Sequence, residues 1–285
     1  MAMTRRQMLA ASAAAAGMAA LTPSTAQAAR VPGRLRQSVC RWPYGRIPLP
    51  EFARAVSSIG LEAIDLLQPD EWRVVADAGL VCSMGYPADR PDFIATGFND
   101  PAHHPMLLGE LERTIPLAAR AGVPNVITMF GNRRGRSDAD GARHCVEGLR
   151  RIAPLAEEQG VTVCVELLNS KVDHADYMGD HTAWGVEVMQ AVGSPRVKLL
   201  YDIYHMQIME GDVIRTIRDN FAWIGHFHTG GVPGRHELDG TQELNYHAIA
   251  AVIADLGFTG YLAHEFMPTG DPMAALRQGA EACTV

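Results

Sequence analysis

Short apolar runs alternate with longer segments of helical periodicity along most of this chain. Runs rich in Val, Ile, Leu and aromatic residues, which are typical of buried β-strands, occur at 36–40, 61–66, 81–84, 125–130, 161–166, 197–202, 223–228 and 260–265. Residues 161–165 and 197–201 are mostly apolar on both strand faces, as expected for parallel strands covered by helices. The pattern therefore predicts eight strands, at least some of them in a parallel sheet.

Segments with apolar residues three and four positions apart separate these runs and predict helices. They span 50–59, 69–78, 102–121, 138–159, 182–192, 211–220, 245–256 and 272–282. Gly122, Gly160 and Gly257 each stand between such a segment and the next strand, where glycine commonly ends a helix. Eight strand and helix units in about 250 residues predict a single (β/α)8 TIM barrel. The alternative is a doubly wound open sheet, but no G-x-G-x-x-G follows the first strand to support it.

The first residues have the features of an export signal. Arg5 and Arg6 precede an apolar stretch at 8–21, and the segment ends in the small-x-small sequence Ala26-Gln27-Ala28. The apolar stretch is shorter than the about 20 residues that a membrane-spanning helix needs. We therefore predict a twin-arginine signal peptide at 1–28, cleaved near Ala28, and a catalytic barrel at 29–285. The mature protein is expected to be periplasmic or otherwise extracytoplasmic, with the Tat translocase as its partner during export.

Composition narrows the range of ligands. With 47% hydrophobic and 20% charged residues, the chain is typical of a globular protein with a substantial core. Its 32 acidic and 25 basic residues give a net charge of -7, which argues against nucleic acid or anionic lipid as a partner and favours a small molecule. The five cysteines are odd in number and lack C-x-x-C spacing, so neither a disulfide framework nor a cysteine zinc site is predicted.

Polar residues end the last four predicted strands: Glu166, Asp202, His228 and Glu265. In a TIM barrel these strand ends meet at one rim, where active sites lie. Each carboxylate alone has the alternative of capping the next helix, and a lone histidine there is more often a hydrogen-bonded core residue. That alternative applies equally to His226, which shares a strand face with His228.

The four together predict a metal site. Three carboxylates buried side by side without a cation would repel one another and lose their hydration. The mainly oxygen ligand set suits Mg²⁺ or Mn²⁺, and the imidazole allows Zn²⁺ or Co²⁺ as alternatives.

Two further residues are predicted to face the substrate. His205 follows Asp202 by three positions, on the loop expected after the sixth strand, and Arg235 lies in the glycine-rich segment 230–237 after the seventh. A surface salt bridge to Glu237 or Asp239 is the alternative for Arg235. The glycine-rich loop instead favours an arginine that holds a substrate carboxylate in bidentate fashion.

Several of these segments resemble the xylose isomerase-like barrels, which include sugar isomerases, ketose 3-epimerases and hydroxypyruvate isomerases. The segments are 165–169 (VELLN), 201–207 (YDIYHMQ), 225–228 (GHFH), 231–237 (GVPGRHE), 240–246 (GTQELNY) and 260–266 (GYLAHEF). The Asp-x-x-His spacing at 202–205 and the GVPGRHE and GTQELNY segments are most similar to hydroxypyruvate isomerases. At position 228, hydroxypyruvate isomerases often have glutamine, whereas the epimerases have histidine, as here.

The resemblance implies roles for these residues. Glu166, Asp202, His228 and Glu265 match the metal ligands of the family, Glu166 and Glu265 also match its acid/base pair, and His205 and Arg235 match substrate contacts. The implied reaction is the isomerisation of hydroxypyruvate to tartronate semialdehyde through an enediolate, with a divalent metal. No nicotinamide, flavin or phosphate-binding motif is present, which suits a redox-neutral reaction.

Other functions stay open. A ketose epimerase or isomerase would use the same site on a neutral sugar. A metal-dependent DNA-repair endonuclease is disfavoured by the net charge of -7. A non-catalytic exported binding protein would bind its ligand without turnover. A homo-oligomer is also left open.

Overall fold

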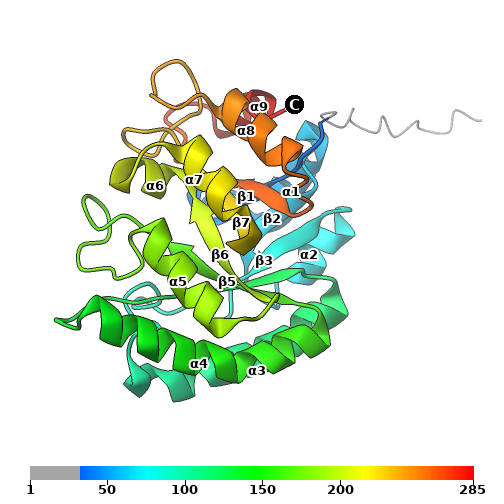
Figure 1. The fold of residues 1–285 in the computed structure, drawn as a ribbon. Coiled ribbons are helices and arrows are strands. Elements are labelled where there is room, and N and C mark those ends of the chain that lie inside the picture. Colours follow the sequence, from blue (N-terminus) through cyan, green and yellow to red (C-terminus); the bar gives the residue numbers. More distant parts are fainter. Residues whose placement is uncertain (1–32) are drawn as a thin grey trace, which may run out of the picture.

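Eight parallel strands close into a barrel in the computed structural model, which describes residues 33–285 (Figure 1). Each strand pairs with its sequence neighbours, and β1 pairs with β8 to complete the ring. The strands are β1 (Arg36–Cys40), β2 (Ala63–Leu67), β3 (Val81–Gly85), β4 (Asn125–Met129), β5 (Thr162–Leu167), β6 (Val197–Asp202), β7 (Ile224–Thr229) and β8 (Tyr261–His264). The predicted TIM barrel is therefore confirmed.

Helices cover the outside of this barrel, as Figure 1 shows for the long pair α3 and α4. They are α1 (Leu49–Ile59), α2 (Trp72–Asp77), α3 (His104–Ala121), α4 (Asp138–Gln159), α5 (Thr182–Val192), α6 (Ile203–Met209), α7 (Val213–Asn220), α8 (Tyr246–Asp255) and α9 (Pro272–Ala282). Short 3-10 turns occupy Trp42–Tyr44, Pro101–His103 and Phe221–Trp223. Within the described part of the chain, no helix combines the length and the apolar character that crossing a membrane requires.

One predicted loop is a helix. The segment after β6, where His205 was expected on a loop, forms α6 directly, because the Asp202 carboxylate accepts hydrogen bonds from the backbone N–H groups of Tyr204 and His205. This is N-capping, which satisfies donors that the first helical turn leaves unpaired. The immediate helix start holds His205 in a buried, fixed position.

β1 and β6 have the predicted bounds, and the other strands differ from prediction by one residue or two at one end or both. β5 and β7 each run one residue past Glu166 and His228, and β8 ends one residue before Glu265. β5 is buried along its whole length, as predicted for a parallel strand covered by helices.

The loop between β3 and α3 is fixed against the end of β4. The backbone N–H of Phe98 donates to the carbonyl of Met129, and that of Asn99 donates to the carbonyl of Phe130. At Gly97 a Cβ atom would lie 2.1 Å from the carbonyl carbon of Phe130, so only glycine permits this approach. The contact holds the preceding loop residues beside the barrel mouth.

The two ends of the described chain meet, since the backbone N–H of Arg34 donates to the carbonyl of Val285 at 2.8 Å. All five cysteines are free and buried, in line with the absence of a predicted disulfide framework. The predicted twin-arginine signal at 1–28 lies outside the described residues, so its cleavage stays a prediction.

Candidate functional site

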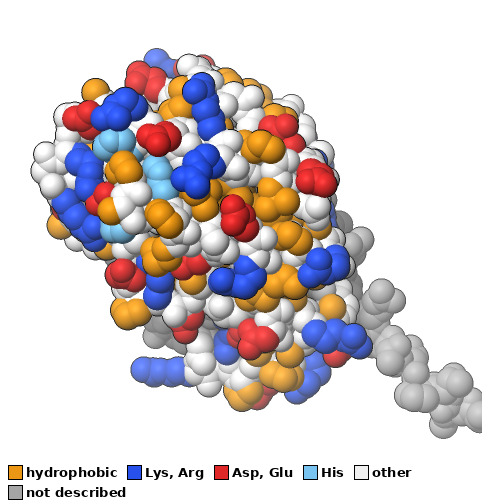
Figure 2. Space-filling view, turned by 90° about the horizontal axis from the view of Figure 1, so that it is seen from below, with side chains coloured by type: hydrophobic (Ala, Val, Ile, Leu, Met, Phe, Trp, Pro, Cys, Tyr) orange, Lys and Arg blue, Asp and Glu red, His pale blue; other side chains and the backbone are white. Residues whose placement is uncertain are grey.

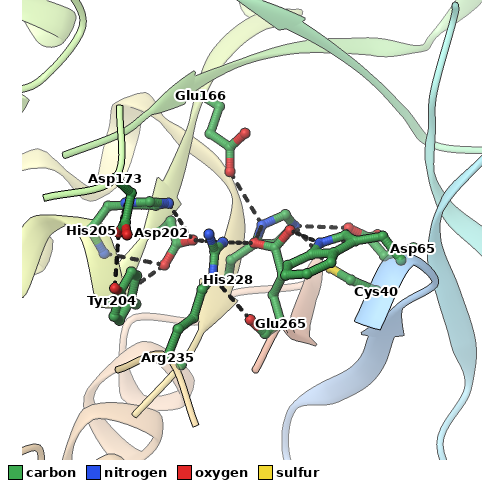
Figure 3. Close-up of polar contacts among 12 residues, drawn as sticks. Cys40, Asp65, Glu166, Asp173, Asp202, Tyr204, His205, His228, Arg235 and Glu265 are labelled. Carbon is green, nitrogen blue, oxygen red and sulfur yellow. Dashed lines mark hydrogen bonds and ion pairs between the residues drawn. The ribbon is translucent and has the colours of Figure 1, made fainter. Parts of the chain in front are cut away.

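The four strand-end residues lie together at the C-terminal rim of the barrel (Figure 3). Glu166 comes from β5, Asp202 from the end of β6, His228 from β7 and Glu265 from the position after β8. One potential ligand atom from each lies within 4.8 Å of the others, and all four residues are buried. The structure thus brings together the whole set selected from the sequence.

The His228 ring lies between Asp65 on one side and Glu166 and Glu265 on the other. Its Nε2 is 2.8 Å from Asp65 Oδ2, while its Nδ1 is 2.7 Å from Glu265 Oε2 and 3.4 Å from Glu166 Oε1. Nδ1 is buried and has no partner in hydrogen-bonding geometry within residues 33–285. In a neutral His228 that donates from Nε2 to Asp65, the Nδ1 lone pair faces oxygen atoms that also carry lone pairs, an arrangement that favours a cation between them.

The electrostatics of His228 reflect the carboxylates around it. Burial lowers the pKa of His228, but Cys40, Glu265 and Asp65 together outweigh burial and hold it well above its usual range. A bound divalent cation would supply positive charge to the same carboxylates. The donor set therefore fits a divalent metal.

The surroundings shift the pKa values of Glu166 and Glu265 in opposite directions. Burial, with the charge of Glu265 beside it, raises the pKa of Glu166. Burial alone would also raise the pKa of Glu265, but Arg235 and His228 outweigh it and hold that pKa well below its usual range. Burial raises the pKa of Asp202 to about 7, although Arg235 opposes the shift. Carboxyl groups whose pKa values are pushed apart in this way are suited to distinct acid and base roles.

Arg235 binds the site carboxylates rather than the surface residues considered as alternatives. Its Nη2 is 2.6 Å from Glu265 Oε2 and 3.0 Å from Asp202 Oδ2, and its Nε donates to the Glu265 carbonyl. Glu237 instead accepts hydrogen bonds from Thr269. Arg235 itself has a left-handed backbone with φ of 58°, and its side chain is largely buried, at 12% exposure. The guanidinium is thus held at the site, with part of it on the cavity described below.

His205 is oriented by Asn169. Its Nδ1 accepts hydrogen bonds from the backbone N–H of Asn169 at 3.2 Å and from the Asn169 Nδ2 at 2.6 Å. Nε2 therefore carries the proton of the neutral ring. Burial, with Arg235 nearby, holds the pKa of His205 well below its usual range, so the ring is neutral. Nε2 is 3.5 Å from Asp202 Oδ2 and has no hydrogen-bond partner in the described chain. His205 is fully buried and is not among the residues that line the cavity described below.

Asp65 and Trp42, which contact the carboxylate and histidine cluster, were not among the sequence candidates. Asp65 on β2 is fully buried and accepts hydrogen bonds from Ser83 Oγ at 2.5 Å and from the Nε2 atoms of His226 and His228. Trp42 donates from Nε1 to Glu265 Oε1 at 2.6 Å. The sequence signal for Asp65 is a charged residue inside an apolar strand, which requires a partner when buried.

A cavity of about 440 Å³ opens beside the carboxylates. Glu166, Glu265 and Arg235 form its polar end. The remaining lining residues are Trp42, Leu66, Tyr86, Asp89, Phe93, Ile94, Ile127, Met129, Leu168 and His174. On the face in Figure 2, acidic and basic side chains are interspersed with apolar ones. The enclosed polar end and its size suit a small-molecule ligand.

The fold and this site define a TIM-barrel enzyme with a carboxylate and histidine centre at the C-terminal rim. The chain belongs to the xylose isomerase-like TIM barrel family, whose model matches residues 11–284. Two relatives are a putative hydroxypyruvate isomerase from Homo sapiens, 27% identical over 82% of this chain and 80% of the relative, and a 2-oxo-tetronate isomerase from Cupriavidus necator, 36% identical over 59% and 64%. The names of these relatives support an isomerase, and the chain is an enzyme of this class.

A crystal structure of an AP endonuclease, family 2, from Brucella melitensis superimposes with a TM-score of 0.77 at 23% identity, covering 85% of this chain and 97% of the other. A D-psicose 3-epimerase in the presence of D-fructose gives a TM-score of 0.69 at 19% identity, covering 87% and 96%. These likenesses show the shared fold.

Proposed function

We propose that this enzyme interconverts hydroxypyruvate and tartronate semialdehyde by proton transfer through an enediolate, with a divalent metal. The observation that carries the proposal is the pair Glu166 and Glu265, which face one imidazole and have pKa values pushed in opposite directions. The human relative that is named a putative hydroxypyruvate isomerase supports the substrate.

Glu166, Asp202, His228 and Glu265 would hold the metal, with Mg²⁺ or Mn²⁺ best suited and Co²⁺ or Zn²⁺ as alternatives. When bound, such an ion polarises the carbonyl and stabilises the oxyanion that forms as the carbon proton leaves. The unpaired Nδ1 of His228 supports this placement.

The side chains of the site have distinct tasks in this reaction. Glu166, whose pKa is raised by burial, is the general base that removes the proton at C3 and returns it at C2. His205 donates from Nε2 to a substrate oxygen, and Arg235 supplies positive charge for the substrate carboxylate. Proton return by Glu265 from β8, instead of Glu166 from β5, would suit an epimerase, which needs both faces of the substrate.

A ketose 3-epimerase is the second candidate. It is favoured by His228, which stands where epimerases have histidine, and by the D-psicose 3-epimerase from Agrobacterium fabrum, which is 35% identical over 44% of this chain. A non-catalytic binding protein would show neither reaction.

Proton NMR in D₂O tests these proposals. The purified mature protein with Mg²⁺ is mixed with hydroxypyruvate and, in parallel, with several ketoses. Deuterium incorporation with formation of tartronate semialdehyde, lost in Glu166→Gln and Glu265→Gln but kept in the exposed control Glu158→Gln, supports the isomerase. Exchange with a ketose alone moves the assignment to the epimerases, and no exchange with any compound refutes both.

We also propose that the protein is exported after folding, on the basis of Arg5, Arg6 and the Ala26-Gln27-Ala28 site. Mass spectrometry of the protein from the extracytoplasmic fraction is expected to find an N-terminus at residue 29. Replacing both arginines by lysine is expected to keep the uncleaved chain in the cytoplasm. Cytoplasmic recovery of the unaltered, full-length chain would refute export.

A further inference from the structure

The cavity is larger than hydroxypyruvate requires. A molecule of liquid water takes up about 30 Å³, so a three-carbon acid needs on the order of 100 Å³. The cavity of about 440 Å³ therefore has room for a second group several times larger than the reacting part of the substrate. Because one continuous cavity includes Glu166, Glu265 and Arg235, this room adjoins the reacting carbons.

The additional room is mainly apolar. Beyond the charged end, aromatic and aliphatic side chains form most of the wall, including Tyr86, Phe93, Ile94, Ile127 and Met129. Asp89 and His174 are the polar residues of this part. Tyr86 and Phe93 pack against each other with ring centroids 4.3 Å apart. A small, fully hydrated acid would leave this surface in contact with water, whereas a ring with an apolar face would cover it.

The loop between β3 and α3, which carries Tyr86, Phe93 and Ile94, is held in place by several contacts. Phe93 is buried, and the Arg90 guanidinium lies over its ring while bonding to Glu110 and Asp92. The same loop continues to Gly97, where it is fixed against β4. Because the loop is already ordered, little conformational entropy is lost when a ligand binds to it.

Leu66 provides an independent observation. It has a left-handed backbone with φ of 59°, at an irregularity in the pairing of β2 with β3, and its side chain lines the cavity. A branched-chain residue in this region costs about 1–3 kcal/mol and tends to occur at functional sites. Such irregularities redirect side chains near active sites.

Resting on the proposed function, we infer that the substrate is a 3-hydroxy-2-oxo acid whose C3 carries a ring-sized group with an apolar face. Leu66, Tyr86, Phe93 and Ile94 determine this preference. Hydroxypyruvate is then the smallest member of the substrate class, with hydrogen in place of the ring.

The reaction is the same for the larger substrate. In R–CH(OH)–CO–COO⁻ the C3–H bond breaks and a C2–H bond forms, giving R–CO–CH(OH)–COO⁻. The C3 hydroxyl loses its proton as C3 becomes the carbonyl, and the oxygen on C2 gains one. C3 is oxidised and C2 is reduced, so no external oxidant or reductant is needed.

The test compares substrates in which R is hydrogen, methyl, phenyl or cyclohexyl. Turnover is followed by proton NMR in D₂O with the metal-loaded enzyme. Since one added methylene in an apolar pocket is worth about tenfold or more, kcat/KM is expected to rise at least tenfold from hydrogen to phenyl. Equal or falling kcat/KM along the series overturns the inference while leaving the proposed function intact. Absence of exchange with every member refutes the proposed function, and the inference with it.

Two variants locate the preference in the wall. Ile94→Trp fills the cavity, and Leu66→Gly removes a wall side chain at a backbone angle that glycine adopts without strain. Both are expected to lower the phenyl to hydrogen ratio of kcat/KM at least about fivefold, and Leu66→Gly to keep its melting temperature. Asp212→Gly, at another left-handed position outside the cavity lining, is the matched control. An unchanged ratio in both wall variants overturns the assignment.

Discussion

Replacing Asp65 by asparagine tests whether this buried carboxylate positions His228. Asp65 Oδ2 accepts from His228 Nε2 at 2.8 Å and from His226 Nε2 at 3.2 Å, and Oδ1 accepts from Ser83 at 2.5 Å. Asparagine keeps the shape but turns one acceptor into an N–H donor that faces a donor. His228 then loses the partner that keeps the proton on Nε2 and leaves Nδ1 directed at Glu166 and Glu265.

The magnitude follows from burial. Leaving a buried donor unpaired costs about 1–3 kcal/mol, and removing one partner of a buried charge pair costs about 3–5 kcal/mol. We expect the free energy of unfolding to fall by about 2–4 kcal/mol, which corresponds to about 5–15 °C in melting temperature for a domain of this size. Loss of the carboxylate behind a metal-bound histidine typically weakens metal binding about 10- to 100-fold.

Two assays separate stability from positioning. Thermal melts of the metal-free variant report the first effect, and calorimetric titration with Mn²⁺ below the melting range reports the second. Ser83→Ala removes only the hydrogen bond to Asp65 Oδ1 and is expected to lower the melting temperature while leaving Mn²⁺ affinity unchanged. If Asp65→Asn binds Mn²⁺ within about twofold of the unaltered protein, against the 10- to 100-fold expected, Asp65 does not position His228.

Asp65→Asn is also expected to change how the free energy of unfolding depends on pH in acid. Burial alone would raise the pKa of Asp65, but His226 and His228 outweigh it and hold that pKa below its usual range. A carboxyl with a lowered pKa stabilises the fold above its unfolded pKa of about 4, and this contribution is lost as the pH falls further. Asp65→Asn is therefore expected to lose less stability than the unaltered protein between about pH 4 and pH 2, measured by urea unfolding.

Further predictions concern the substrate, the metal, the thiols and the packing. Arg235→Ala is expected to lower kcat/KM for hydroxypyruvate by at least about tenfold, the value of a charged hydrogen bond. The loss for a neutral ketose is expected to be smaller, arising only from the lost pairing with Glu265 and Asp202; equal losses would show that Arg235 does not bind the acid. Exhaustive chelation is expected to abolish deuterium exchange and Mn²⁺ to restore it, whereas undiminished exchange would exclude a catalytic metal. Because all five cysteines are buried and burial raises the pKa of each, a thiol reagent should titrate none in the native protein and five after denaturation. Gly97→Ala, whose Cβ would meet the backbone at 2.1 Å, is expected to lower the melting temperature by several degrees, whereas Gly109→Ala in α3, where the space is open, should leave it equal or higher.

The sequence was most informative about polar residues at strand ends. Glu166, Asp202 and Glu265 could be found because strand periodicity placed their runs and barrel topology brought their ends to one rim. His205 could be selected from its spacing to Asp202, but its placement on a loop was wrong. The N-cap formed by Asp202 starts α6 at once, and strand patterning contains no information on that capping geometry.

Asp65 was missed for a different reason. Its partners His226 and His228 lie 161 and 163 positions further along the chain, and the contact exists only after β1 and β8 close the ring. Periodicity predicts which face of a strand or helix is buried. It does not predict which polar group on a distant strand a buried side chain contacts. The cavity wall was missed for the same reason, because Tyr86, Phe93 and Ile94 lie in an irregular loop whose position depends on its contact with β4.

The barrel divides into two halves with different contributions to the site. All four proposed metal ligands come from β5 to β8, whereas most of the apolar wall, from Trp42 to Met129, comes from β1 to β4 and their loops. In the proposed reaction, the proton chemistry and the binding of the substrate carboxylate by Arg235 are therefore encoded in the second half, and the preference for the group on C3 in the first. A family can change its substrate by exchanging the first half-barrel while it keeps the second, provided that a partner equivalent to Asp65 still reaches His228 across the junction.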